Sequence, residues 1–145
     1  MEQRVTIQQT LPAVWKAMYG LSASVSQLSI TPIQKELIKI RASQLNQCAF
    51  CLNMHTRDAL KLGETPQRIF LLNAWKETNL FTPEEKAILA LTEEVTLIHQ
   101  HGVSDATYQQ AEQFFSPETI AEIIMSAVVI NAWNRIAVST NLPID

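Results

Sequence analysis

Four places in the sequence carry a hydroxyl residue followed directly by proline, and this pattern constrains the fold more than any other feature. They are Thr31-Pro32, Thr65-Pro66, Thr82-Pro83 and Ser116-Pro117. A threonine or serine side chain can cap the free backbone N–H groups at the start of a helix. The fixed φ of the following proline suits the first helical position. The pattern therefore predicts at least four helices.

Neighbouring residues support these helix boundaries. In a capping box, the side chain three residues after the cap bonds back to the backbone of the cap residue. Two pairs have this spacing, Thr31 with Gln34 and Thr82 with Glu85. Gly63 and Gly102 can adopt the left-handed conformation that ends many helices.

Between these signals, apolar residues recur every three or four positions, which is the helical period. Ile88, Leu91, Val95 and Ile98 form one such stripe in a helix expected over about 83–99. Further helices are expected over about 12–26, 48–62 and 105–115, and no alternation of period two is long enough for a strand. We therefore predict an all-α fold, a single-domain helical bundle of about six to seven helices over residues 1–145.

The expected helix from Pro117 to about Val138 is apolar on all sides of its axis. Such a helix has to be covered all round. In a chain of 145 residues, another subunit can supply part of that cover. A mean hydropathy of +0.03 is consistent with a covered apolar surface. We therefore expect a homo-oligomer.

Charge and hydropathy exclude two classes of partner. The chain has 11 Lys and Arg against 14 Asp and Glu, a net charge of −3 with no basic cluster, so nucleic acid is not an expected partner. No uninterrupted apolar run approaches the roughly 18 residues of a membrane span, so no membrane partner is expected. Met1-Glu2-Gln3-Arg4 lacks the basic and apolar features of a secretory signal, which favours a cytoplasmic location.

Both cysteines of the chain lie in one short segment, Cys48-Ala49-Phe50-Cys51-Leu52-Asn53-Met54-His55. At about 100° per residue, the two thiols and the imidazole share one face of a helix. In a reducing compartment, a cysteine pair of this kind is more often reactive or metal-binding than a structural bridge. The segment is the strongest candidate for chemistry in the chain.

Three physical effects favour redox chemistry at this pair. The free N–H groups at a helix start stabilise a thiolate near Cys48, and His55 can accept a proton from Cys51. A sulfenic acid formed on one sulfur can condense with the other thiol to a disulfide, which a thiol reductant reopens. An imidazole in this role needs an orienting partner, and Glu36 on the preceding helix is the candidate.

The residues from Glu36 to Ala59, ELIKIRASQLNQCAFCLNMHTRDA, resemble the core motif of the carboxymuconolactone decarboxylase superfamily, specifically its AhpD-like alkylhydroperoxidase branch. A glutamate twelve residues before a CxxC pair and a histidine four residues after it carry the resemblance. It covers the chain from Glu36 to about Glu94 and resumes at Asn131-Ala132-Trp133-Asn134-Arg135.

The resemblance implies an all-helical fold that assembles into trimers or hexamers and reduces hydroperoxides. It implies that Glu36 and His55 form a proton relay, that Cys51 attacks the peroxide and that Cys48 is the resolving thiol. The expected partners are a hydroperoxide substrate and a thiol reductant or redox partner protein. Neither a cofactor nor a metal is expected.

Several alternatives stay open at this stage. The helix-dipole argument favours Cys48 as the more acidic thiol, so it disagrees with the resemblance on which sulfur attacks. The pair could also be inert, or bind zinc together with His55 and His99 or His101 in a non-enzymatic module or thiol sensor. A second enzymatic reading is a protein disulfide reductase or redox relay.

The three tryptophans are expected to lie in the core or an interface, although one could line a substrate pocket. They are Trp15, Trp75 and Trp133.

Overall fold

All regular secondary structure in residues 2–144, the range that the computed structural model describes, is helical. This confirms the all-α prediction. The elements are α1 (Ile7–Thr10), α2 (Pro12–Ser26), α3 (Pro32–Leu45), α4 (Ala49–Lys61), α5 (Pro66–Leu71), the 3-10 helix η1 (Leu72–Glu77), α6 (Pro83–Thr96), α7 (Ile98–His101), α8 (Asp105–Glu112) and α9 (Pro117–Thr140).

The helix boundaries follow the capping residues. Both predicted capping boxes are formed, at the starts of α3 and α6. Gly63 and Gly102 have φ angles of +96° and +73°, as expected of residues that follow a helix end. The end of α9 was not predicted correctly. The helix continues past Val138 to Thr140 and ends where Asn141 adopts the left-handed conformation. Asparagine tolerates that conformation better than most residues with a side chain.

The structure contains more helical segments than the predicted six to seven because some of them are very short. The helices α1 and α7 have four residues each, and η1 is a 3-10 segment of six residues. Segments of this length do not contain enough apolar repeats to produce a helical period. The helix expected over about 83–99 is divided at Leu97, where the backbone leaves the helical conformation between α6 and α7.

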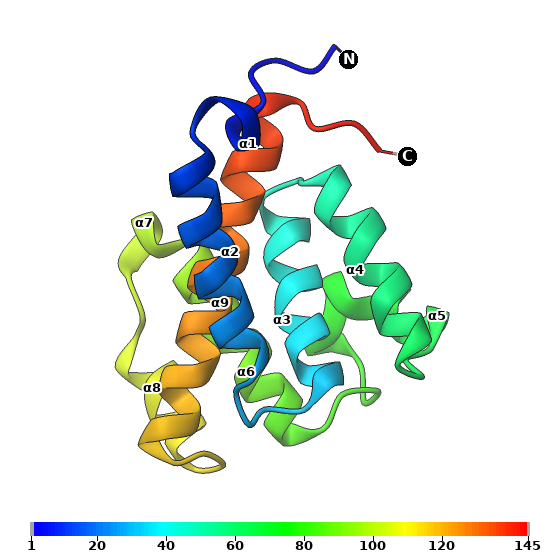
Figure 1. Ribbon diagram of the computed structural model, residues 1–145. Helices are drawn as coiled ribbons and strands as arrows, with labels where there is room; N and C mark the ends of the chain where they lie inside the picture. Colours follow the sequence, from blue (N-terminus) through cyan, green and yellow to red (C-terminus); the bar gives the residue numbers. More distant parts are fainter. Residues whose placement is uncertain (1, 145) are drawn as a thin grey trace.

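The helix α3 packs against α4, α6 and α9 at the centre of the bundle (Figure 1). It contributes to two core clusters, with Ile38 in one and Leu37 and Ile40 in the other. Because opposite faces of α3 are buried, its rotation about its own axis is fixed. The position of each polar residue on α3 is fixed with it.

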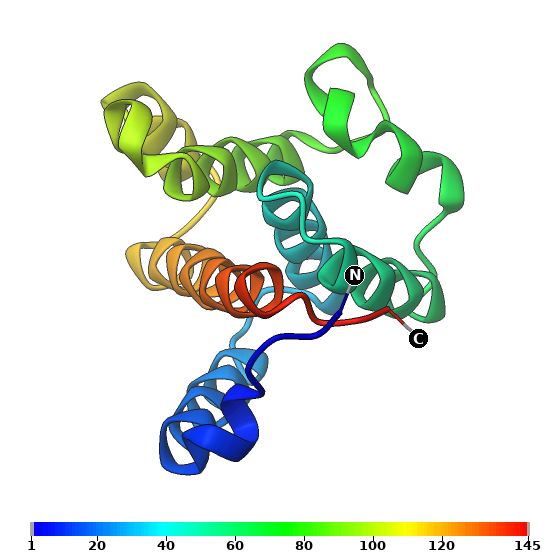
Figure 2. The ribbon, with the colours of Figure 1, turned by 90° about the horizontal axis from the view of Figure 1, so that it is seen from above.

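The helix α2 lies on the outside of the bundle. In Figure 2, α9 separates α2 from α6, and α2 packs mainly on α1 and α9. Only Val25 of α2 is buried. The chain before α1 lies beside the carboxyl-terminal end of α9, at the same end of the molecule as α1 (Figure 1), and the Arg4 backbone N–H donates to the Thr140 carbonyl at 2.9 Å.

By length and composition, α9 could span a membrane, with a mean hydropathy of 1.3 over its most apolar window. Half of that window is buried inside the bundle, as in the core helix of a folded domain. Met125, Val128 and Val138 on α9 stay exposed in the single chain. The homo-oligomer remains a prediction, as does the single domain over residues 1–145, whose two end residues lie outside the described range.

Candidate active site

The two cysteines lie at the amino-terminal end of α4. Cys48 is the N-cap residue, and its sulfur accepts the backbone N–H of Cys51 at 3.4 Å. The Cys48 N–H donates to the Ser43 carbonyl at 3.0 Å, which anchors the cap to the end of α3. Both thiols are free, and their sulfurs are 2.7 Å apart and hydrogen-bonded. Cys48 is 1% exposed and Cys51 is 2% exposed.

The hydrogen bond between the two sulfurs separates their acidities. It lowers the pKa of Cys48 to about 7, against the opposing effect of burial, and the Cys51 backbone N–H adds to the lowering. The same hydrogen bond, together with burial, raises the pKa of Cys51. The pair therefore loses its first proton near neutral pH, and the resulting charge is held mainly on Cys48, in agreement with the helix-dipole argument.

A buried amide network lies beside the thiols, and the sequence analysis did not assign it a role. Asn134 is 1% exposed, and its hydrogen bonds to Cys48 and Cys51 favour the thiolate form of each. Its side-chain NH₂ also donates to the Ser43 hydroxyl at 2.9 Å, while Asn46 donates to its carbonyl oxygen at 2.9 Å. The resemblance around Asn131–Arg135 was the only sequence signal that pointed to this residue.

Glu36 and His55 are in direct contact, as the sequence analysis expected. The distance from His55 Nδ1 to Glu36 Oε2 is 2.9 Å, and Lys39 Nζ binds the other carboxylate oxygen at 2.7 Å. Burial would raise the pKa of Glu36, but the hydrogen bonds from His55 and Lys39 outweigh it, and the pKa is lowered. Because an ionised carboxylate can only accept, His55 Nδ1 donates. The other ring nitrogen, His55 Nε2, is therefore the one available for proton transfer.

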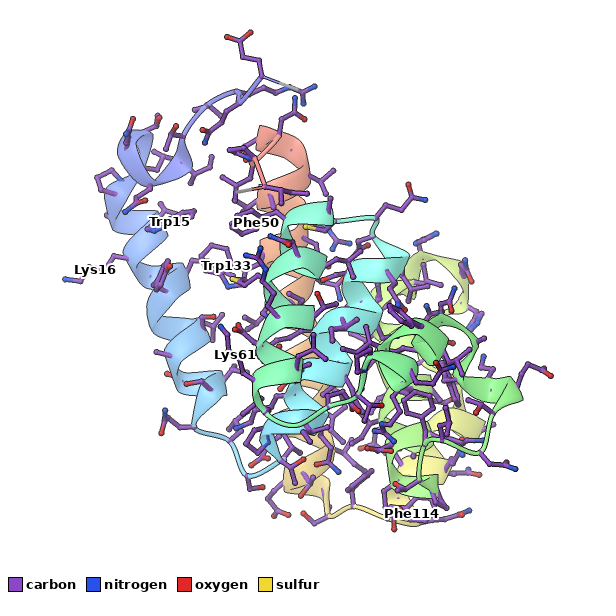
Figure 3. The ribbon with its side chains drawn as sticks, turned by 90° about the vertical axis from the view of Figure 1, so that its right-hand side faces the viewer. Trp15, Lys16, Phe50, Lys61, Phe114 and Trp133 are labelled. Carbon is purple, nitrogen blue, oxygen red and sulfur yellow. The ribbon has the colours of Figure 1, made fainter. Side chains whose placement is uncertain are left out.

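An apolar groove connects this site to the solvent. It has a volume of about 440 Å³ and lies between α2, α9 and the hairpin of α3 and α4. Cys51 and His55 both line the groove, whereas Cys48 does not. Figure 3 shows Trp15 of α2, Trp133 of α9 and Phe50 of α4 in the space between these elements.

The aromatic rings of the groove pack on one another. Trp133 meets Trp15 and Tyr19 edge-on, with ring centroids 5.1 and 5.5 Å apart. The Trp133 indole N–H donates to the Ser22 hydroxyl at 3.1 Å. Trp75 does not line the groove. It is buried in the core cluster between α3 and η1, and its indole N–H donates to Glu93 at 2.7 Å.

The structure brings together Glu36, Cys48, Cys51 and His55, the four predicted site residues, whose catalytic roles stay predictions. In residues 2–144, the single group of side chains close enough to share a metal ion is Glu36, His55 and Asp58, with ligand atoms within 4.8 Å of one another.

This group does not contain the ligands of the zinc alternative. The cysteines, His99 and His101 are not in it, and both carboxylates already bind lysines, Glu36 with Lys39 at 2.7 Å and Asp58 with Lys61 at 3.0 Å. The zinc alternative therefore finds no support in this arrangement.

Comparisons with known proteins point to one family. The sequence matches the carboxymuconolactone decarboxylase family over residues 9–94. It is 43% identical over 139 residues to the uncharacterized protein YdfG of Bacillus subtilis strain 168. The matched region covers 96% of this chain and 95% of YdfG.

Solved structures agree with this assignment. A protein of unknown function from Agrobacterium tumefaciens, described as a candidate antioxidant defence protein AhpD, matches with a TM-score of 0.95 and 33% identity, over 99% of this chain and 100% of that one. The debrominase Bmp8 shares the fold at a TM-score of 0.85 and 16% identity, over 95% of this chain and 74% of that one. The chain belongs to the carboxymuconolactone decarboxylase family, in its AhpD-like branch.

Proposed function

We propose that the protein is a thiol-dependent peroxidase that reduces hydroperoxides through a dithiol–disulfide cycle of Cys48 and Cys51. One observation carries this proposal. Cys51 and His55 line the same apolar groove, and the sulfur of Cys48, which does not line it, lies 2.7 Å from that of Cys51. A peroxide in the groove would meet Cys51 first.

The cycle begins with a proton transfer inside the cysteine pair. The shared charge rests mainly on Cys48, and the Cys51 proton crosses the hydrogen bond to Cys48 to leave a thiolate facing the groove. The Cys51 thiolate attacks the outer peroxide oxygen, so that an S–O bond forms and the O–O bond breaks. Protonated His55, held by the Glu36 carboxylate, gives its proton to the alkoxide that leaves. The products are an alcohol and Cys51 sulfenic acid.

The second half of the cycle closes the disulfide. Neutral His55 takes the Cys48 proton, and the Cys48 thiolate attacks the Cys51 sulfur. The S–S bond forms, the S–O bond breaks, and the leaving hydroxide takes the proton back from His55 to give water. A dithiol reductant then reopens the disulfide by exchange and is itself oxidised to a disulfide. Two electrons pass from the reductant to the peroxide in each cycle.

The burial of the pair favours a small substrate over a protein disulfide. Cys48 and Cys51 are at most 2% exposed. Thiol exchange requires the attacking sulfur to approach the target disulfide in line. A folded partner protein cannot bring its own sulfur to thiols this buried as readily as a small dithiol can. The protein disulfide reductase alternative is therefore less consistent with this geometry.

The test is a peroxidase assay with tert-butyl hydroperoxide and dithiothreitol. We expect Cys51→Ser to lower turnover by about 10²-fold or more, because the attacking sulfur is lost. We expect Cys48→Ser to consume one equivalent of peroxide and to stop at a Cys51 sulfenic acid, which dimedone traps and mass spectrometry locates. Full turnover by Cys51→Ser would overturn the proposal, and dimedone labelling of Cys48 in the wild type would reverse the two roles.

A further inference from the structure

The groove is long enough for a chain-like ligand. The helix α9 lines it from Ser126 to Thr140, a length of about 21 Å at the rise of an α-helix. At one end lie Ser26 and Lys35, where α2 ends and α3 begins. At the other end lies the segment before α2, including Val5 and Ile7. Most of the wall between these ends is apolar, so an aliphatic chain could lie along it.

The charged residues that line the groove are all basic. None of the described lining residues is acidic, and the two lysines among them are Lys35 and Lys39. Lys39 binds the Glu36 carboxylate at 2.7 Å and is therefore neutralised. Lys35 Nζ bonds to the carbonyl oxygens of Ser26 and Leu28 at 2.8 and 2.6 Å. These groups are neutral, and no carboxylate oxygen of residues 2–144 lies within 4.0 Å of Lys35 Nζ, although Glu122 binds the neighbouring Ser29 and Ile30. Its third N–H is left for a ligand.

The spacing between Lys35 and the thiols restricts the ligand. Glu36 contacts His55, and Cys51 lies four residues before His55 in α4, which places Cys51 about 6 Å farther along the groove. Lys35 points the other way, toward the end of α2. A single molecule that contacts both Lys35 and Cys51 must therefore carry its two polar groups several methylenes apart.

From these observations we infer that the groove binds a fatty-acid hydroperoxide, with its carboxylate on Lys35, its aliphatic chain along α9 and its hydroperoxide at Cys51. The inference rests on the proposed peroxidase function and specifies its substrate class. An ion pair in an apolar, partly enclosed groove is screened less than one on the surface. Lys35 would therefore distinguish a free acid from its ester or alcohol.

The first experiment measures binding without turnover. Dodecanoate and 1-dodecanol are titrated into the reduced protein, and the fluorescence of the groove tryptophans Trp15 and Trp133 is followed. We expect dodecanoate to bind about tenfold more tightly than the alcohol, as a charge-assisted bond in an apolar site would give. Lys35→Met should remove this preference while leaving the affinity for the alcohol unchanged.

Two further variants separate recognition from structure. Lys35→Arg keeps the charge and should keep the preference for dodecanoate. Lys16→Met is the matched control, because Lys16 is exposed on α2 and points away from the groove in Figure 3. An equal loss of affinity for acid and alcohol in Lys35→Met, or no preference in the wild type, would overturn the inference.

The second experiment compares turnover of linoleic acid hydroperoxide with that of its methyl ester. We expect Lys35→Met to lower kcat/KM about tenfold for the acid and to leave the ester unaffected. Binding of dodecanoate that depends on Lys35, without turnover of either peroxide, would support the carboxylate site and overturn the peroxidase. Turnover of both peroxides without any effect of Lys35 would support the peroxidase and overturn the carboxylate site.

Discussion

Cys48 and Cys51 differ in acidity although they lie three residues apart on one helix. The hydrogen bond from the Cys51 thiol is the largest cause of the low pKa of Cys48, which is about 7. The same bond raises the pKa of Cys51. The more acidic sulfur is thus the one behind the groove, while the sulfur that faces the groove keeps the proton at rest. Acidity and access, the two properties of an attacking thiol, are divided between two residues.

This division predicts a pH dependence. The ultraviolet absorbance of the thiolate should therefore rise with pH and have its midpoint near pH 7, where the pair loses its first proton. In Cys51→Ala the main stabilising hydrogen bond is absent, so the midpoint should move up toward the ordinary thiol pKa of about 8.5. An absorbance titration of each protein measures both midpoints. An unchanged midpoint in Cys51→Ala would show that the helix start alone sets the acidity.

Glu36 gives a second prediction at the scale of the residue. Its lowered pKa keeps the carboxylate ionised at neutral pH, where it can stabilise a protonated His55. Glu36→Gln keeps the size and loses the charge, so peroxide turnover should fall by about 10²-fold. Glu36→Asp keeps the charge, so its turnover should lie between those of Glu36→Gln and the wild type.

The control for this prediction is Glu112→Gln, an exposed carboxylate on α8, which should turn over as the wild type does. The pH midpoint of the thiolate absorbance serves as a second readout. If that midpoint shifted in Glu36→Gln, Glu36 would act on the thiols or on the fold rather than through His55.

Among the elements, α5 is joined to α6 by a partly buried cation. Arg68 on α5 binds Glu64 at 2.8 Å and Glu85 at 2.7 Å, and its guanidinium lies 4.6 Å from the centroid of the Phe81 ring. It also donates to the Leu80 carbonyl. Glu64 is only 7% exposed. A carboxylate this buried depends on its partner.

Arg68→Met should therefore destabilise the protein by about 3 to 5 kcal/mol, because it leaves buried carboxylates without a counter-ion. The matched control is Lys61→Met, which removes an exposed ion pair with Asp58 and should change stability by less than about 1 kcal/mol. Urea unfolding followed by circular dichroism measures both. If the two variants lost the same stability, Arg68 would be an ordinary surface cation.

For the whole molecule, the position of α2 determines the groove. It forms one wall, yet only Val25 of its fifteen residues is buried. Val14 and Leu21 are 58% and 39% exposed, and neither lines the groove. Exposed aliphatic residues on one helix are typical of a surface that another subunit covers. This observation and the exposed apolar residues of α9, Met125, Val128 and Val138, agree with the predicted homo-oligomer.

We predict that light scattering on the purified protein will give the mass of a trimer or hexamer. The double substitution of Val14→Glu and Leu21→Glu should produce monomers, because two charges would be buried in the contact. Ile98→Glu places the same charge at an exposed isoleucine of α7 and should leave the assembly intact. A wild-type protein that is monomeric at micromolar concentration would contradict the prediction.

The sequence determined the helices with clear boundaries, because the signals at those boundaries are local. Thr31 and Thr82 act on N–H groups three residues away, so their capping boxes need no other part of the chain. The spacing of Cys48, Cys51 and His55 on α4 is local in the same sense. The contact of Glu36 with His55 was expected from the motif as a whole, since it crosses from one helix to the next.

Only the tertiary structure decided which groups surround the thiols and what lies in front of them. Asn134 reaches the cysteines from 83 positions away or more, across the packing of α9 on α3 and α4. Lys35 faces the groove because α2 ends beside it. The helical pattern of the residues around Lys35 does not predict this position. The physical reason is the distance along the sequence over which each effect acts. Helix caps and helical periodicity involve residues only a few positions apart. Burial and charge balance depend instead on helices that meet only after the whole chain has packed.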